Sequence, residues 1–210
     1  MNIKKVFIIL FSALFLVGVL AGCGSTTSTK NDAKGEPAAK SSIDEIKSRG
    51  TIRIGIFGDK PPFGYIDANG KNQGYDVYIA KRFAKDLLGD ETKIEWVVLE
   101  PASRVEYLQT NKVDIILANF TVTDERKEKV DFAKPYMKVA LGIVSDKGAP
   151  ITSVDQLKGK KLIVTKGTTA ETYFTKNHPD IELLKFDQIT QSFEALKDKR
   201  GAAYANDNTL

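Results

Sequence analysis

The chain has 210 residues, a formal net charge of +4 from 31 lysines and arginines against 27 acidic side chains, and one cysteine. One cysteine excludes a disulfide within the chain. The mixed charges form no basic stripe interleaved with aromatic residues, so we expect no nucleic-acid partner. Because the chain also has only one histidine, we expect neither a metal site nor a bound cofactor.

The N-terminus has the parts of a secretory signal. Lys4 and Lys5 precede the apolar residues 6–20, which end in the motif Leu-Ala-Gly-Cys at Cys23. A charged start, a short apolar run and small residues at the cleavage point define such a signal, whereas a membrane-spanning helix needs about 20 apolar residues. We therefore predict a signal peptide over residues 1–22. Its removal takes away Lys4 and Lys5 and leaves 29 basic and 27 acidic side chains, a net charge of +2.

The motif that ends at Cys23 resembles the lipobox of bacterial lipoproteins, in which the cysteine is lipid-modified and becomes the first residue. This resemblance implies a lipid anchor on Cys23. The next residues are rich in Ser, Thr, Lys, Ala and Gly, and such a segment cannot bury enough apolar surface to fold. We expect residues 23–42 to be a flexible tether.

Strands and helices alternate from residue 42 onwards, which predicts a parallel or mixed sheet covered by helices. In the first half we expect strands at 51–57, 94–99 and 113–118, and helices at 75–88, 103–110 and 124–130. The helix 75–88 ends at Gly89 and offers a buried face of Val77, Ile79, Ala80, Phe83, Ala84 and Leu87.

The second half repeats this pattern after Gly148. We expect strands at 139–144, 162–165, 181–186 and 202–205, and helices at 153–157, 169–175 and 191–199. This order favours an α/β fold with two lobes, 43–140 and 141–210, joined near residues 136–145. Because the last strand is followed directly by Leu210, we expect the second lobe to be incomplete.

The segment 113–136 is the most informative one for function. A strand buried on both faces leads into a polar turn at 119–123 and then into a helix that starts with Thr123 and two acidic residues. Arg126 stands in the first turn of that helix, where exposed N–H groups favour anions, and a guanidinium binds both oxygens of a carboxylate. The alternative is a surface ion pair between Arg126 and Asp131 or Glu128.

Several segments together carry a family resemblance. They are SIDEIKSRGTIRIGIFGDKPPFGY, NQGYDVYIAKRFAKDLLG, NKVDIILANFTVTDERKEKVDFAKPYM and LIVTKGTTAETYF, in this order. The chain resembles the periplasmic-type solute-binding proteins of polar amino-acid ABC importers (family 3), most closely those that bind cysteine. The resemblance implies a two-lobed periplasmic-binding-protein fold of type II that closes on its ligand like a hinge.

The resemblance also implies a function. A monomeric, lipid-anchored protein on the outer side of the cell membrane would capture a free L-amino acid and deliver it, unchanged, to the permease subunits. Cysteine is the favoured ligand, with aspartate or glutamate next. One alternative is a dehydratase for cyclic acids on the same fold, although no catalytic set is visible around the expected cleft. A second alternative is the sensing domain of a membrane receptor.

By the same resemblance, Arg126 would hold the ligand's carboxylate, aided by the N–H and hydroxyl of Thr121. Ala118 and Asn119 would present backbone carbonyls. Asn119 stands where family members often have glycine, so it either adds a side-chain contact or serves as a turn residue that tolerates unusual dihedral angles.

From the second lobe, Thr165, Thr168 and Thr169 would complete the carboxylate site, and Asp207 would take the ammonium group. Read without the resemblance, Thr168 is an ordinary helix cap and Asp207 a solvated turn residue.

The side-chain pocket would consist of Phe57, Lys60, Phe63 and Arg104. The alternative role of Phe57 and Phe63 is to fill the core, as aromatic residues beside strands more often do than touch a ligand. Arg104 is typical of members that bind acidic ligands, whereas the run FGDKPPFGY is closer to the cysteine binders. We assign Tyr75 and Trp96 to packing and His178 to a surface turn.

Overall fold

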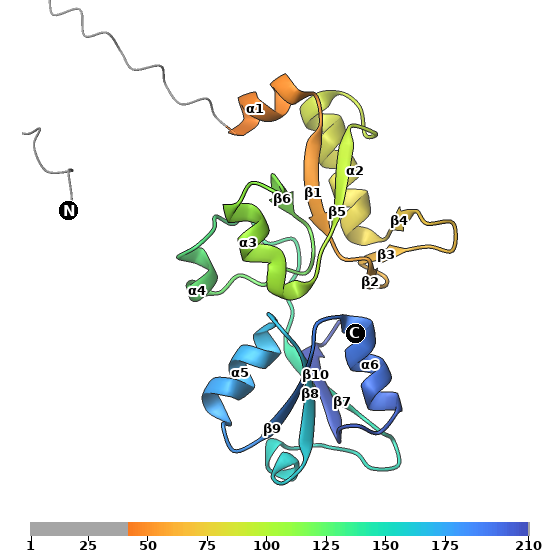
Figure 1. Ribbon diagram of the computed structural model, residues 1–210, viewed down its shortest axis with the longest axis vertical. Coiled ribbons are helices and arrows are strands. Elements are labelled where there is room, and N and C mark those ends of the chain that lie inside the picture. The colour runs from red at the N-terminus through yellow and green to blue at the C-terminus, as the bar shows by residue number, and fades with distance from the viewer. Residues whose placement is uncertain (1–41, 210) are drawn as a thin grey trace, which may run out of the picture. The chain divides into compact units, whose positions relative to one another are not determined.

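The structure is a computed structural model that describes residues 42–209, which belong to one compact unit. The predicted signal peptide, Cys23 and the tether up to residue 41 lie outside the described residues, as does Leu210. Two main sheets organise the described part (Figure 1). We call the part around the first sheet lobe 1 and the part around the second sheet lobe 2.

The sheet of lobe 1 is parallel, with the strand order β5-β1-β6. Its strands are β1 (Ile52–Ile56), β5 (Ile94–Val98) and β6 (Ile115–Ile116). The central strand β1 is apolar because both of its faces are covered, and Ile52, Ile54 and Ile56 are almost fully buried. They pack with Ile46 of helix α1 (Ser42–Arg49) and with helix α2.

Helix α2 (Tyr75–Leu88) has the predicted bounds, and Gly89 caps its C-terminus in the left-handed conformation at φ +77°. Val77, Ala80 and Ala84 form its buried stripe. The prediction that Phe83 is buried was wrong, since this side chain is 49 % exposed. Successive residues lie about 100° apart around a helix, so Phe83 falls beside the stripe that contains Ala84.

The other elements of lobe 1 are shorter than predicted. The strand expected at 113–118 is hydrogen-bonded as β6 over two residues only. The helix expected at 103–110 is a 3₁₀ turn, η1 (Pro101–Ser103), followed by α3 (Arg104–Gln109), and the next helix is α4 (Asp124–Lys127). A small antiparallel sheet of β2 (Asp59–Lys60), β3 (Gly64–Ile66) and β4 (Asn72–Gln73) was not predicted.

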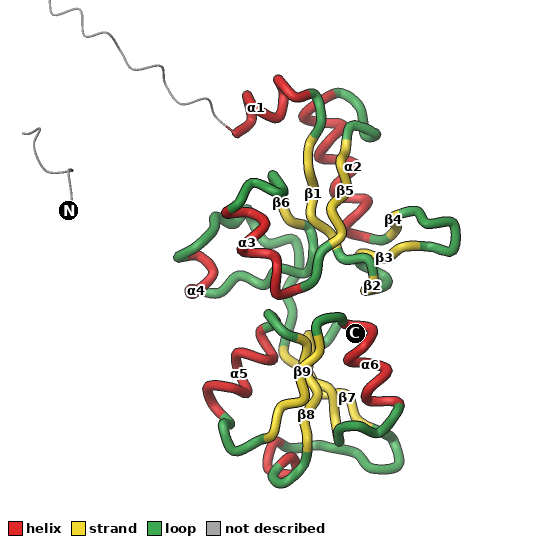
Figure 2. Tube along the Cα trace, in the orientation of Figure 1, coloured by secondary structure: helices red, strands yellow, loops and turns green. Residues whose placement is uncertain are grey.

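Lobe 2 has a four-stranded sheet in the order β7-β10-β8-β9, in which only β7 is antiparallel to its neighbour. The strands are β7 (Leu141–Ser145), β8 (Lys161–Thr165), β9 (Glu182–Phe186) and β10 (Ala203–Asp207). The helices are η2 (Val154–Leu157), α5 (Thr169–Asn177) and α6 (Ile189–Lys197). The segment between α4 and β7 contains neither helix nor strand (Figure 2).

Both faces of this sheet are covered, α5 on one side and α6 on the other (Figure 1). Alternate residues of β8 point to opposite faces, so Leu162 and Val164 pack with Phe174 of α5, whereas Ile163 packs with Ala195 of α6. The predicted α/β alternation in the second half is thereby confirmed. It brings the C-terminal ends of β8, β9 and β10 to the edge that faces lobe 1.

Candidate functional site

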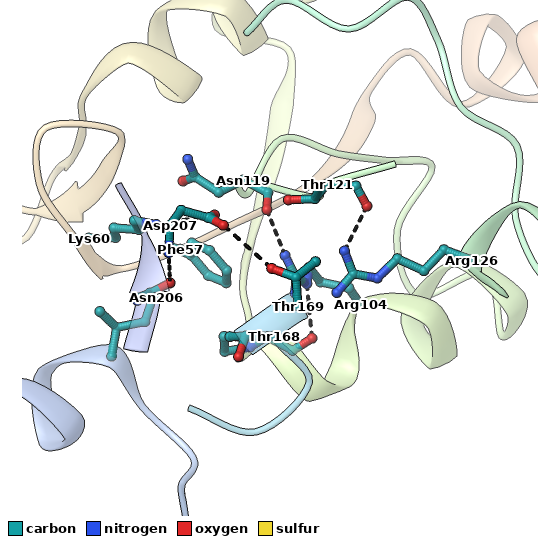
Figure 3. Close-up of a pocket in the computed structure, with 12 residues that line it drawn as sticks. Phe57, Lys60, Arg104, Asn119, Thr121, Arg126, Thr168, Thr169, Asn206 and Asp207 are labelled. Atoms are coloured by element: carbon teal, nitrogen blue, oxygen red, sulfur yellow. Dashed lines mark hydrogen bonds and ion pairs between the residues drawn. The ribbon is translucent and has the colours of Figure 1, made fainter. Parts of the chain in front are cut away.

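A cavity lies at the C-terminal ends of strands from both lobes (Figure 3). Such strand ends are the usual location of ligand sites in α/β proteins. The cavity measures about 10 Å³, which is room for about one water molecule. Its lining residues are Phe57, Lys60, Pro101, Arg104, Asn119, Thr121, Arg126, Thr168, Thr169, Ile189, Asn206 and Asp207.

Two arginines dominate the lobe 1 side of the cavity. The guanidinium carbons of Arg104 and Arg126 lie 4.6 and 4.7 Å from the ring centroid of Phe120. Each arginine also donates a 2.9 Å hydrogen bond to the same acceptor in lobe 2, the carbonyl oxygen of Gly167. The arginines therefore connect the two lobes directly.

Other donors of the two arginines are bound within lobe 1. Arg126 donates to the carbonyl of Thr121 at 2.7 Å, and Arg104 donates to the carbonyls of Ala118 and Asn119, both at 3.0 Å. These contacts, and not an ion pair with Asp131 or Glu128, hold the Arg126 side chain. The surface alternative was therefore wrong.

Burial shifts the pKa values of the cationic side chains at the site. Arg104 is 3 % exposed, and burial together with the neighbouring charge of Arg126 lowers its pKa to about 9. Burial also lowers the pKa of Arg126. Among the lining residues, Lys60 and the two arginines face one carboxylate, Asp207. The cavity therefore carries an excess of positive charge that favours an anionic group.

Asn119 has the backbone geometry of a turn residue, with φ at +43°. Its carbonyl accepts hydrogen bonds from Arg104 and from the N–H of Thr121. Its side-chain Oδ1 is buried, and no partner for it is found among the described residues. The turn role is confirmed, and a ligand contact by the side chain stays a prediction.

Lobe 2 contributes polar groups from the start of α5 and the end of β10. Thr168 caps α5, since its hydroxyl accepts from the N–H of Glu171 at 3.2 Å. The hydroxyl of Thr169 donates to Asp207 at 3.5 Å (Figure 3). Asp207 is 8 % exposed, so the alternative of a solvated turn residue was wrong.

Lys60 reaches the same carboxylate from lobe 1. Its Nζ lies 4.0 Å from Oδ2 of Asp207, and the side chain is 3 % exposed. Burial lowers the pKa of Lys60, although the charge of Asp207 opposes that shift. Lys60 and Asp207 thus face each other across the lobes.

Three predicted site residues lie outside the cavity lining. Thr165 is fully buried, and its hydroxyl forms hydrogen bonds with Ser192 at 2.7 Å and Tyr204 at 2.8 Å. Ala118 contributes its carbonyl to Arg104. Phe63 is 7 % exposed and meets the ring of Tyr75 edge-on at 6.5 Å, so it fills the core as its alternative role proposed.

Three lining residues were not predicted: Pro101, Ile189 and Asn206. Pro101 and Ile189 each follow the C-terminal end of a strand, and this position was the signal that could have found them. Asn206 precedes Asp207, and its side-chain oxygen accepts from the N–H of Asp207 at 2.8 Å.

A second buried carboxylate lies beside the site in lobe 1. Asp76, at the start of α2, has no exposed surface and accepts a 2.9 Å hydrogen bond from the hydroxyl of Tyr136. Burial raises the pKa of Asp76 to about 6, against the opposing effects of the Tyr136 hydrogen bond and the charge of Lys60. The other residues assigned to packing or turns have partners as well: Trp96 joins the lobe 1 core, and His178 follows α5 next to Tyr173.

Within residues 42–209, no helix combines the length and apolarity needed to cross a membrane. In the same part of the chain, no three His, Cys, Asp or Glu side chains are grouped so that they could hold a metal ion.

Comparison with known proteins identifies the family. Residues 52–203 match the bacterial extracellular solute-binding proteins, family 3, and the chain belongs to this family. The solute receptor for L-cysteine of Neisseria gonorrhoeae is 64 % identical, with a TM-score of 0.79, over 80 % of this chain and 68 % of that one. The cysteine-binding protein of Campylobacter jejuni is 60 % identical, with a TM-score of 0.78, over 80 % and 67 %.

A glutamine-binding protein of an ABC transporter of Bacillus subtilis (strain 168) is 35 % identical over 99 % of this chain and 76 % of that protein. These likenesses confirm the predicted class of fold, the two-lobed periplasmic-binding-protein fold of type II. The family is one of extracellular proteins, so the chain belongs on the outer side of the cytoplasmic membrane.

Proposed function

We propose that the chain is the substrate-binding component of an ABC importer for a polar L-amino acid, with cysteine favoured and aspartate or glutamate next. One observation carries this proposal: the same cavity is lined by the guanidinium of Arg126 from lobe 1 and the carboxylate of Asp207 from lobe 2. These two groups complement the carboxylate and the ammonium that every amino acid carries.

In the proposed complex, Arg126 and the N–H and hydroxyl of Thr121 hold the ligand's carboxylate. Thr168 and Thr169 complete this half of the site from lobe 2. Asp207 takes the ammonium group, and its negative charge also offsets the charge of the nearby Lys60.

The ligand's side chain would lie against Phe57, Lys60 and Arg104. These residues pack closely, with the guanidinium carbon of Arg104 5.5 Å from the ring centroid of Phe57. A small polar side chain suits this space, which supports cysteine. The relatives from Neisseria gonorrhoeae and Campylobacter jejuni are described as binding cysteine. The cationic groups make aspartate and glutamate the next candidates.

Binding would require the two lobes to separate and close again. The cavity of about 10 Å³ has room for about one water molecule, so the amino acid would enter in a more open arrangement. The segment between α4 and β7 is free of regular structure and is the candidate hinge between the lobes.

We further propose that a monomeric protein, lipid-anchored through Cys23, presents the ligand to the permease subunits outside the membrane. Anchoring would support transport because it raises the effective concentration of the receptor near the permease.

The decisive experiment is calorimetric titration of the protein without its signal peptide. The ligands are L-cysteine under reducing conditions, L-cystine, L-aspartate, L-glutamate and L-glutamine, and the recovered ligand is analysed by chromatography. Tight binding of one amino acid that is recovered unchanged is the expected result. Absence of binding by a folded protein would contradict the proposal, and conversion of an offered cyclic acid would favour the dehydratase alternative.

A further inference from the structure

Helix α6 of lobe 2 lacks an N-terminal cap from its own sequence. Its N-cap residue is Gln188, whose side chain makes no capping hydrogen bond, and glutamine is not among the residues that cap well. The first N–H groups of a helix have no partner within the helix and need one from elsewhere.

Lobe 1 supplies this partner. Oδ2 of Asp59, on β2, accepts from the N–H of Thr190 at 3.1 Å and from its hydroxyl at 3.2 Å. Thr190 is the second residue of α6, so Asp59 occupies the place of a capping side chain. Its negative charge also lies at the positive end of the helix dipole.

Apolar packing fixes the same end of α6. Ile189, the first residue of the helix, is 5 % exposed and belongs to a cluster with Phe57, Leu99 and Ala118, all from lobe 1. The side chain of Gln188 adds a 3.3 Å hydrogen bond to Glu100. The first turn of α6 therefore rests on lobe 1 through both polar and apolar contacts.

These contacts join the cap to the cavity. Ile189 lines the cavity from lobe 2, and Lys60, the residue after Asp59, lines it from lobe 1. A shift of α6 away from Asp59 would move Ile189 away from Lys60 and open the cavity between these two residues.

We propose that Asp59 is a positioning residue that caps α6 across the cleft and so holds the lobes closed on the ligand. This inference rests on the proposed function, which supplies both the amino-acid ligand and the closure of the lobes. When the lobes part, Asp59 and Thr190 return to water, so their contact stabilises the closed form only. An interaction made only in the closed complex slows ligand release more than it affects association.

The chain offers a matched control. Oδ1 of Asp90 accepts from the N–H of Thr92 at 2.8 Å and from its hydroxyl at 2.7 Å. This is the same pair of contacts, but both residues belong to lobe 1. Asp90→Ala therefore removes an equivalent pair of hydrogen bonds that does not cross the cleft.

The test is stopped-flow measurement of L-cysteine binding and release for the wild type, Asp59→Ala, Asp59→Asn and Asp90→Ala. We expect Asp59→Ala to raise the dissociation rate on the order of fivefold, the effect of losing a helix cap. The association rate should change by less than about twofold. Asp59→Asn should recover much of the loss, because asparagine also caps, and Asp90→Ala should release the ligand at the wild-type rate.

Equal dissociation rates for Asp59→Ala and the wild type would overturn the inference, as would an equal increase in Asp90→Ala. Small-angle scattering without ligand gives a readout that does not depend on the proposed function. A larger radius of gyration for Asp59→Ala than for the wild type supports the inference even if no tested amino acid binds. If amino-acid titrations fail but the scattering curves differ, the binding proposal alone is wrong.

Discussion

The ring of Phe120 lies against two guanidinium groups at the site. Arg104 and Arg126 both contact its ring, and both donate to Gly167. Two like charges repel each other in a buried site, so this arrangement is stable only with acceptors close by. The shared carbonyl of Gly167 and the nearby Asp207 provide part of that compensation, and an incoming carboxylate would provide the rest.

Replacement of Arg126 should therefore weaken binding strongly. We expect Arg126→Ala to cost about 2–5 kcal/mol of binding free energy, as truncation of one partner of a buried charged pair generally does. Arg126→Lys should recover only part of this binding free energy, because a lysine cannot form the bidentate contact with a carboxylate. Calorimetric titration with L-cysteine measures both variants. Arg82→Ala, on the exposed face of α2 with its side chain 65 % exposed, is the control, and equal affinities for the two alanine variants would refute the role of Arg126.

Asp76 should make stability depend on pH in the direction opposite to most carboxylates. Its pKa is raised from 3.8 to about 6 in the folded protein, so the folded state binds this proton more tightly than the unfolded chain does. The free energy of unfolding should then fall as the pH rises from about 4 to about 6, by roughly 2–3 kcal/mol. Asp76→Asn should remove this fall, and urea unfolding of both proteins between pH 4 and 7 measures the difference.

Tyr136→Phe provides the control for Asp76. The Tyr136 hydroxyl donates to the Asp76 carboxylate and stabilises its charged form, so its loss should raise the pKa of Asp76 further and extend the fall in stability to higher pH. A difference between wild type and Asp76→Asn that does not change with pH would contradict the raised pKa.

At this scale, the sequence predicted which residues carry charge at the site but not how they are held. Arg126, Thr121 and Asp207 could be placed because a family motif fixes their positions after strands. The sharing of Gly167 by two arginines could not be predicted, since it depends on the distance between two lobes that are far apart in the chain. Nothing in the sequence distinguishes Ile189 from other apolar residues near a helix start, because its place in the cavity depends on the packing of α6 against lobe 1.

Among the elements, the turn before α5 brings the backbones of the two lobes into close contact. Gly167 has φ +74°, and a Cβ built on it would lie 2.4 Å from Cα of Ala102 in lobe 1. No side chain fits there while the arginines hold the carbonyl of Gly167. The glycine is thus required both by its backbone conformation and by the approach of lobe 1.

Gly167→Ala should therefore prevent full closure and reduce affinity for the amino acid by at least about tenfold, since closure is needed for tight binding. The left-handed backbone alone costs roughly 1–2 kcal/mol of folding stability for a residue with a Cβ. Gly159→Ala isolates that cost, because Gly159 has φ +72° and nothing within 4 Å of its Cβ position. We expect both variants to lose similar stability in thermal unfolding, but only Gly167→Ala to lose affinity. Similar affinities would show that the lobes do not need this approach.

The elements that were predicted well are those with a strong apolar pattern. Helix α2 has the expected bounds because Gly89 ends it, and β8 and β10 read as buried strands since α5 and α6 cover both faces of their sheet. Strands β2, β3 and β4 were missed because each has only two or three residues and pairs locally. Strand β6 is shorter than expected because the chain turns at Ala118 and Asn119, whose carbonyls bind Arg104 rather than a neighbouring strand.

At the scale of the whole molecule, the two lobes have a division of charge that suits capture of a zwitterion. Lobe 1 contributes Lys60, Arg104 and Arg126 to the cavity, and lobe 2 contributes Asp207. A free amino acid carries one charge of each sign, so it can bridge the lobes with its carboxylate on one and its ammonium on the other. In the proposed complex neither lobe alone supplies all of the contacts to the ligand, so binding would be linked to closure.

The proposed lipid anchor determines where this binding takes place, and Cys23→Ser tests it. A cysteine-linked lipid should hold the processed protein in the membrane fraction, whereas the serine variant should appear in the soluble fraction outside the cytoplasmic membrane. Amino-acid affinity should be the same for both forms, because Cys23 is separated from the folded unit by the predicted tether. Uptake of the amino acid by cells should nevertheless fall in the variant, since a released receptor is diluted away from the permease. Membrane fractionation followed by immunoblotting checks the location, and retention of Cys23→Ser in the membrane fraction would mean that residues other than Cys23 anchor the protein.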